Sequence, residues 1–87
     1  MQKGDLVSII TPLYNSARFI EETIKSVQQQ TYSNWELVIV DDASSDRSVE
    51  IVQKLASNDG RIRLFTEEEN KGAAYCRNYA IKQAQGT

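Results

Sequence analysis

The chain has 87 residues, a formal net charge of −2, and an ordinary globular composition with 40% hydrophobic and 25% charged residues. This length allows one domain at most, and the composition excludes a disordered tail, a collagen-like repeat and a disulfide scaffold. The Lys and Arg residues are scattered and form no basic stripe, which disfavours nucleic-acid binding. With no histidine and only one cysteine, Cys76, a zinc site is disfavoured, Ser-His and Cys-His nucleophile pairs are excluded, and a reducing, cytoplasmic location is expected.

Three apolar, β-branched runs predict strands at residues 6–10, 37–40 and 62–65. The first two runs are almost continuously apolar, which is typical of strands buried on both faces. A segment with helical period follows each run, and the strand regions begin at residues 6, 35 and 62. This spacing fits βαβ units, and right-handed crossovers then predict a parallel sheet in a three-layer α/β/α fold of order β-α-β-α-β-α.

Each predicted helix has a start signal and an apolar face. The first should begin at Ser16 and the second after a cap among residues 44–46, while Asn70 and Gly72 should open the third. Residues at helical spacing then define the inner faces. These faces are Phe19, Ile20, Ile24 and Val27; Val49, Val52, Leu55 and Ala56; and Ala73, Arg77, Ala80, Ile81 and Ala84.

Only three strands precede the end of the sequence, whereas doubly wound sheets usually have more. We therefore expect residues 1–87 to be the N-terminal part of an incomplete, Rossmann-like domain. An unpaired apolar first strand would then favour self-association.

Polar and aromatic side chains gather where the predicted strands end. Ligands of open parallel sheets bind beyond the carboxyl ends of the strands, and segments 11–15, 40–46 and 67–78 should meet there. Tyr14 offers an aromatic face, and Asp41 and Asp42 offer carboxylates. This pairing suits a nucleobase with a ring N–H, such as uracil or guanine. Neither a G-x-G-x-x-G motif nor a P-loop follows the first strand, which argues against NAD enzymes and P-loop NTPases.

Structural roles for the same residues stay open at this point. Asp41 and Asp42 could merely cap the next helix, and Tyr14 could be a packing ring. Arg77 could form an ion pair with either aspartate or contact a phosphate. Asn70 could cap a helix, bind a ligand, or do both.

Three stretches together resemble the family-2 glycosyltransferases, which have a GT-A fold. They are "VSIITPLYN" (7–15), "FIEETIKSVQQQTYSNWELVIVDDASSD" (19–46) and "NKGAAYCRNYAI" (70–81). The resemblance implies transfer of a hexosyl or N-acetylhexosaminyl group from a nucleotide-sugar, commonly a UDP-sugar, to a glycan, lipid or other acceptor, as in polysaccharide or cell-wall biosynthesis. Residues 1–87 would then be the N-terminal, nucleotide-sugar-binding part of a larger enzyme, and that enzyme could act at the cytoplasmic face of the membrane.

The resemblance also implies roles for individual residues. Pro12 and Tyr14 would line the base pocket, Asp42 would accept a hydrogen bond from uracil, and Asn70 and Arg77 would approach the nucleotide. Structural roles near the site would fall to Asn15, Asp41 and Gly72.

The family's metal-binding Asp-x-Asp and its catalytic base do not occur in this sequence. Mn²⁺ or Mg²⁺ is expected in the full enzyme, and we expect this chain alone to have no metal site and no transferase activity. One alternative is a non-catalytic module that binds a nucleotide-sugar or a glycan. Another is a receiver-like signalling domain, which also carries paired aspartates but needs an Asp after its third strand, where this chain has Thr66 and Glu67.

Overall fold

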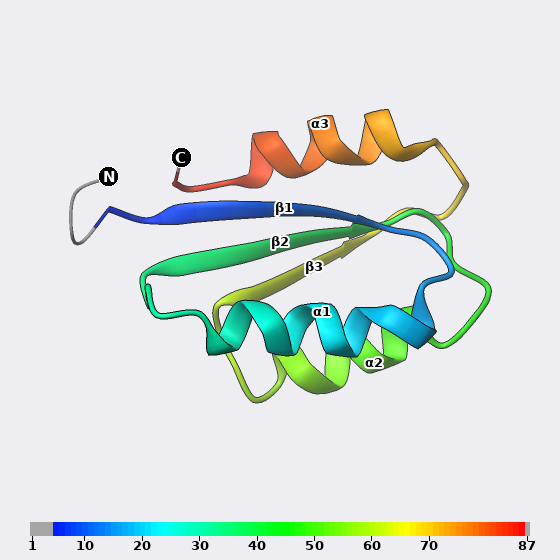
Figure 1. Ribbon diagram of the computed structural model, residues 1–87. Coiled ribbons are helices and arrows are strands. Elements are labelled where there is room, and N and C mark those ends of the chain that lie inside the picture. Colours follow the sequence, from blue (N-terminus) through cyan, green and yellow to red (C-terminus); the bar gives the residue numbers. More distant parts are fainter. Residues whose placement is uncertain (1–4, 87) are drawn as a thin grey trace.

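The computed structural model describes residues 5–86, which form a parallel sheet between two helical layers. The elements alternate along the chain as β1 (Val7–Leu13), α1 (Ala17–Gln29), β2 (Trp35–Asp41), α2 (Ser48–Ala56), β3 (Ile62–Thr66) and α3 (Ala73–Gln83). Helices α1 and α2 cover one face of the sheet and α3 covers the other (Figure 1). The predicted three-layer α/β/α fold is confirmed.

The strand order is β1-β2-β3, with both neighbouring pairs parallel. A receiver-like sheet instead places its first strand between the second and the third. The receiver-like alternative is therefore wrong.

Strand β2 is buried on both faces, as its uninterrupted apolar run predicts. Successive side chains of a strand point to opposite faces. Leu37 and Ile39 accordingly join the core under α1 and α2, while Val38 and Val40 join the core under α3. All four are at most 1% exposed.

Strand β1 runs through Pro12 and ends at Leu13, further than the apolar run predicted. Proline is tolerated because β1 is an edge strand. The N–H of Val7 donates to Asn34 O, and Leu13 O accepts from the N–H of Asp42. The backbone N–H and C=O groups of odd-numbered residues in β1 therefore face β2. The backbone of Pro12, an even-numbered residue, faces the open edge of the sheet.

Two predicted helix faces need correction. Phe19 is 61% exposed, whereas Ile20 and Ile24 are buried. Phe19 lies about 100° around the helix from Ile20, outside the stripe that contacts the sheet. On α3 the buried residues are Cys76 and Ala80, so Arg77 does not lie on the inner face.

The physical reason for the error on α3 is the size of its buried residues. Alanines recur in several directions around this helix, so its apolar pattern does not specify one face. Cys76 and Ala80 are small and four residues apart, and they pack against Val38 and Val40. Ile81 points outward and is 55% exposed.

Glu36 is a buried carboxylate on the α3 face of β2, at the end of the sheet opposite the predicted site. It accepts hydrogen bonds from Ser8 Oγ at 2.6 Å, Arg63 Nη1 at 2.7 Å and Gln85 N at 2.5 Å. These contacts join β1, β2 and β3 to the segment after α3. Gly86 lies in this segment, where a Cβ would stand only 2.3 Å from Leu6 O.

The helices within residues 5–86 include none that is long and apolar enough to cross a membrane.

Candidate nucleotide-binding site

A pocket of about 450 Å³ opens at the carboxyl ends of β1 and β2. Three separate segments contribute to its walls, as the strand order predicted. The lining residues are Pro12, Leu13, Tyr14, Ser16, Asp42, Asn70, Gly72 and Ala73. Of the site residues predicted from the sequence, the pocket therefore brings together Pro12, Tyr14, Asp42, Asn70 and Gly72.

Asp42 supplies a buried acceptor to this pocket and is only 4% exposed. Its Oδ1 accepts from the backbone N–H of Lys71 at 2.6 Å, and its Oδ2 accepts from that of Gly72 at 2.9 Å. The bond from Lys71, supported by that from Gly72, outweighs desolvation and holds the pKa of Asp42 below its ordinary value. Asp42 is therefore ionised at neutral pH, and an ionised carboxylate only accepts hydrogen bonds.

Asp41 points to the opposite face of the sheet and holds the loop that follows β2. Its carboxylate accepts from the Ser44 N–H at 3.0 Å and from Ser44 Oγ at 2.5 Å. The two aspartates therefore diverge, and residues 5–86 contain no group of three or more His, Cys, Asp or Glu side chains that could hold a metal ion. The residues present do not fit a metal centre.

Asn15 joins the loop after β1 to the loop after β2. Its backbone has φ +46°, and its Oδ1 accepts from the N–H of Ser45 at 2.8 Å. Asp46 strengthens the junction because its Oδ2 accepts from the N–H of Ala17, at the first turn of α1. These contacts hold the chain directly after Tyr14 in a defined position.

Tyr14 is 53% exposed, so about half of its surface is accessible to a ligand. Asn70 is also exposed, and its Nδ2 donates to the backbone oxygen of Asp42 at 3.4 Å. An accessible aromatic face, a buried anionic acceptor and an amide thus share one pocket. The aromatic ring can stack on a planar heterocycle, and the carboxylate can accept a hydrogen bond from an N–H group of that heterocycle.

Arg77 lies outside the pocket, on the exposed side of α3. Among residues 5–86 no ion pair joins it to Asp41 or Asp42, so that alternative is wrong. Cys76 occupies the inner position, where burial and then the charge of Asp42 raise the pKa of its thiol to about 11. The thiol is therefore protonated and unreactive at neutral pH.

Sequence reasoning missed the two backbone N–H groups that hold Asp42. Their only sequence signal is the glycine of "NKG" (70–72), which permits an unusual backbone turn but does not identify its partner.

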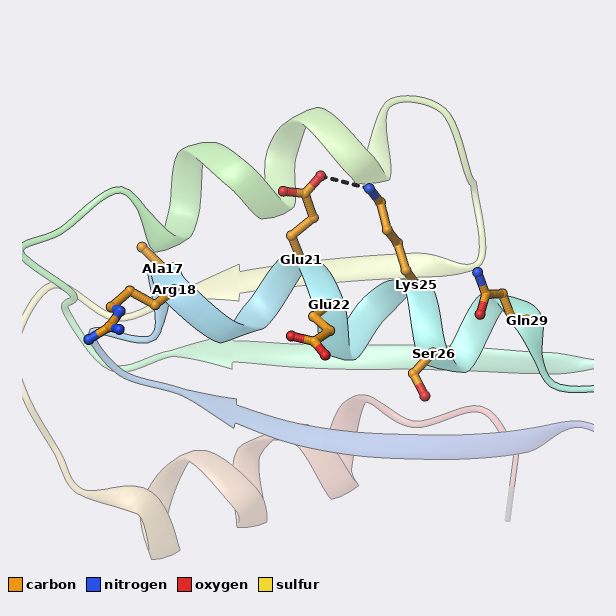
Figure 2. Close-up of a pocket in the computed structure, with 7 residues that line it drawn as sticks. All are labelled: Ala17, Arg18, Glu21, Glu22, Lys25, Ser26 and Gln29. Carbon is orange, nitrogen blue, oxygen red and sulfur yellow. Dashed lines mark ion pairs between the residues drawn. The ribbon is translucent and has the colours of Figure 1, made fainter.

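A larger depression, of about 570 Å³, lies on the outer face of α1 (Figure 2). All its lining residues belong to this one helix, and Lys25 pairs with Glu21 across it at 3.1 Å. Both partners are more than half exposed. Salt bridges of this kind are typical of a solvated helix surface, so the depression is not a candidate site.

Known proteins resemble this chain over nearly its whole length. The model of the family described as Glycosyl transferase family 2 matches residues 8–87. The Escherichia coli enzyme UDP-Glc:alpha-D-GlcNAc-diphosphoundecaprenol beta-1,3-glucosyltransferase WfgD is 52% identical over 81 residues, which cover 93% of this chain and 31% of WfgD. Glycosyltransferase GlyG of Streptococcus pneumoniae serotype 4 is 37% identical over 83 residues, which cover 95% of this chain and 28% of GlyG. The chain spans about a third of the length of several curated relatives that it matches, and a smaller share of others.

Solved structures give the same picture. The mannosyltransferase PcManGT from Pyrobaculum calidifontis, in complex with GDP-Man and Mn²⁺, matches with a TM-score of 0.85 and 34% identity, over 92% of this chain and 24% of PcManGT. Residues 1–349 of S. aureus TarS, in complex with UDP, match with a TM-score of 0.84 and 36% identity, over 94% of this chain and 25% of that one.

Proposed function

Because this chain belongs to glycosyl transferase family 2, we propose that it forms the donor-binding part of an enzyme that transfers a sugar from a UDP-sugar. The acceptor is a glycan or a lipid-linked saccharide, and the transferred group is a hexosyl or N-acetylhexosaminyl unit. TarS was solved with UDP and UDP-GlcNAc, and the name of WfgD specifies a UDP-Glc donor and a lipid-linked acceptor. These relatives support the choice of donor and acceptor.

The observation that carries the proposal is the meeting of Tyr14 and Asp42 in one pocket. In this proposal the uracil ring stacks on Tyr14 beside Pro12, and its N3–H donates to the ionised Asp42. Asn70 contacts the nucleotide from the third segment. Arg77 is assigned to a phosphate, because its guanidinium has no ion-pair partner among residues 5–86.

The reaction itself requires more than these residues. An acceptor hydroxyl attacks the anomeric carbon of the donor, the bond to the diphosphate breaks, and UDP leaves. We assign the catalytic base and the Mn²⁺ or Mg²⁺ ion to the longer enzyme, because the residues described here do not fit a metal centre. The 87-residue chain should therefore bind UDP weakly and transfer no sugar. The same proposal places the reaction at the cytoplasmic face of the membrane.

Calorimetry with UDP and ADP tests the proposal. We expect UDP to bind with a dissociation constant weaker than about 1 µM, that is, with less than about 8 kcal/mol of free energy. ADP should bind more weakly still, because adenine has no ring N–H to donate. Asp42→Ala should weaken UDP binding by the worth of a charged hydrogen bond, about 1.5–3 kcal/mol.

Glu50→Ala is the matched control, since Glu50 is an exposed carboxylate on α2. Equal binding of UDP and ADP, or equal binding of UDP by wild type and Asp42→Ala, would contradict the proposal.

A further inference from the structure

Two consecutive backbone N–H groups hold the carboxylate of Asp42, one on each oxygen. Lys71 N lies 2.6 Å from Oδ1 and Gly72 N lies 2.9 Å from Oδ2. Because each oxygen has its own donor, both the position and the plane of the carboxylate are defined. Successive N–H groups that converge in this way form an anion-binding concavity, and here a side chain of the same protein fills it.

The convergence depends on the backbone of Gly72. Its φ of +91° and ψ of 156° lie in a region that is essentially restricted to glycine. A Cβ built at this position would meet no heavy atom within 4 Å. The requirement for glycine is therefore conformational and not steric. The φ angle sets the direction of the Lys71–Gly72 peptide unit relative to α3, and this unit carries the N–H that bonds Oδ2.

We propose that Gly72 is a positioning residue for base recognition, acting through Asp42. Its backbone conformation presents both N–H groups to the carboxylate. An ionised carboxylate has about four acceptor positions. Two are occupied by the backbone, the buried thiol of Cys76 also contacts the carboxylate, and the side chain as a whole lines the pocket. The identity of the ligand as a uracil nucleotide rests on the proposed function, whereas the orientation of Asp42 does not.

The chain offers a matched pair of glycines for the test. Gly60 also has no heavy atom within 4 Å of a built Cβ, but it lacks the positive φ of Gly72. Gly72→Ala and Gly60→Ala therefore add the same methyl group to open space and differ in the backbone strain. In each variant of the 87-residue chain, carboxyl resonances are titrated by NMR to obtain the pKa of Asp42, and UDP is titrated separately.

We expect Gly72→Ala to raise the pKa of Asp42 towards the ordinary aspartate value, because its hydrogen bonds are weakened. The pKa of Asp46, which is lowered by Ser48 and not by Gly72, should stay unchanged. The dissociation constant for UDP should rise on the order of tenfold, the effect of misaligning a charge-assisted hydrogen bond. Gly60→Ala should leave both quantities at their wild-type values.

The outcomes separate this inference from the proposed function. If wild type binds no UDP, the proposed function fails, and the titration of Asp42 still decides whether Gly72 orients it. An unchanged pKa of Asp42 in Gly72→Ala overturns the inference, as does undiminished UDP binding by that variant.

If Gly72→Ala does not fold, hydrogen exchange in Asp42→Asn gives the answer. The amides of Lys71 and Gly72 should exchange on the order of tenfold faster than in wild type, because a strong acceptor has been replaced. Asp41→Asn should leave both amides unaffected. Equal exchange in wild type and Asp42→Asn would overturn the inference.

Discussion

Replacing Glu36 by alanine should destabilise the fold more than any other single loss of a carboxylate in residues 5–86. The side chain of Glu36 is 5% exposed and that of its partner Arg63 is 29% exposed. Alanine would leave this guanidinium without its carboxylate and would remove the acceptor of the Gln85 N–H. Breaking a buried pair by removing one partner costs about 3–5 kcal/mol. A chain of this length typically has about 4–13 kcal/mol of stability, so Glu36→Ala should lose a large part of it.

The unfolding free energy can be measured in urea by the fluorescence of Trp35, the single tryptophan, which is 2% exposed. Glu50→Ala is the control, because its ion pair with Arg47 is exposed on both sides and should contribute less than about 1 kcal/mol. If Glu36→Ala costs no more than Glu50→Ala, the reasoning is wrong.

The stability supplied by Glu36 should also depend on pH. Desolvation opposes its ionised form, but the bonds from Ser8, Gln85 and Arg63 outweigh it and hold the pKa of Glu36 below its ordinary value of 4.5. A lowered pKa in the folded state stabilises the protein above the unfolded pKa, and this contribution is lost as the pH falls through the folded pKa. The difference between wild type and Glu36→Ala should therefore be constant near neutral pH and shrink below about pH 4.5.

Three further predictions concern the fold. On α1, Ile24→Ala should lower the free energy of unfolding by about 2–5 kcal/mol, because Ile24 is fully buried. Phe19→Ala should change it by no more than about 0.5 kcal/mol, because Phe19 is exposed. Equal losses in urea denaturation would contradict this difference in burial. Hydrogen bonds from Arg61 hold the pKa of Asp59 far below its ordinary value of 3.8. The stability lost in Asp59→Asn should therefore be constant above about pH 3.8 and diminish at lower pH. A loss that does not depend on pH would exclude this linkage. The open edge of β1 should cause association at high concentration, and a monodisperse monomer by light scattering would refute that.

The order of the elements could be predicted because each strand and helix has a strong local signal. The run at residues 37–40 is buried on both faces, and its short, continuously apolar and β-branched sequence indicates a central strand. The extension of β1 through Pro12 could not be predicted, because tolerance of proline depends on the strand lying at the edge. The close contact of Gly86 with Leu6 could not be predicted either, because Gly86 lies beyond the end of α3 at Gln83 and its neighbour is 80 residues earlier in the chain.

The candidate site could be predicted where side-chain chemistry carries the signal. Tyr14 and Asp42 follow their strands directly, and parallel strands place them at one edge. The bonds that orient Asp42 come from backbone N–H groups 29 and 30 residues away, which leave no pattern in the side chains. The position of Arg77 was mistaken because small residues recur around α3 and its buried face is set by packing against β2.

The most direct test of the account is residue-resolved NMR of the 87-residue chain during titration with UDP. We predict progressive shifts of the amide signals of Tyr14, Asp42, Asn70 and Gly72, the residues around the pocket at the strand ends. Signals from the outer face of α1, such as Glu22 and Ser26 in Figure 2, should not move. Absence of shifts at the pocket, or shifts confined to α1, would contradict the assignment of this pocket to the nucleotide.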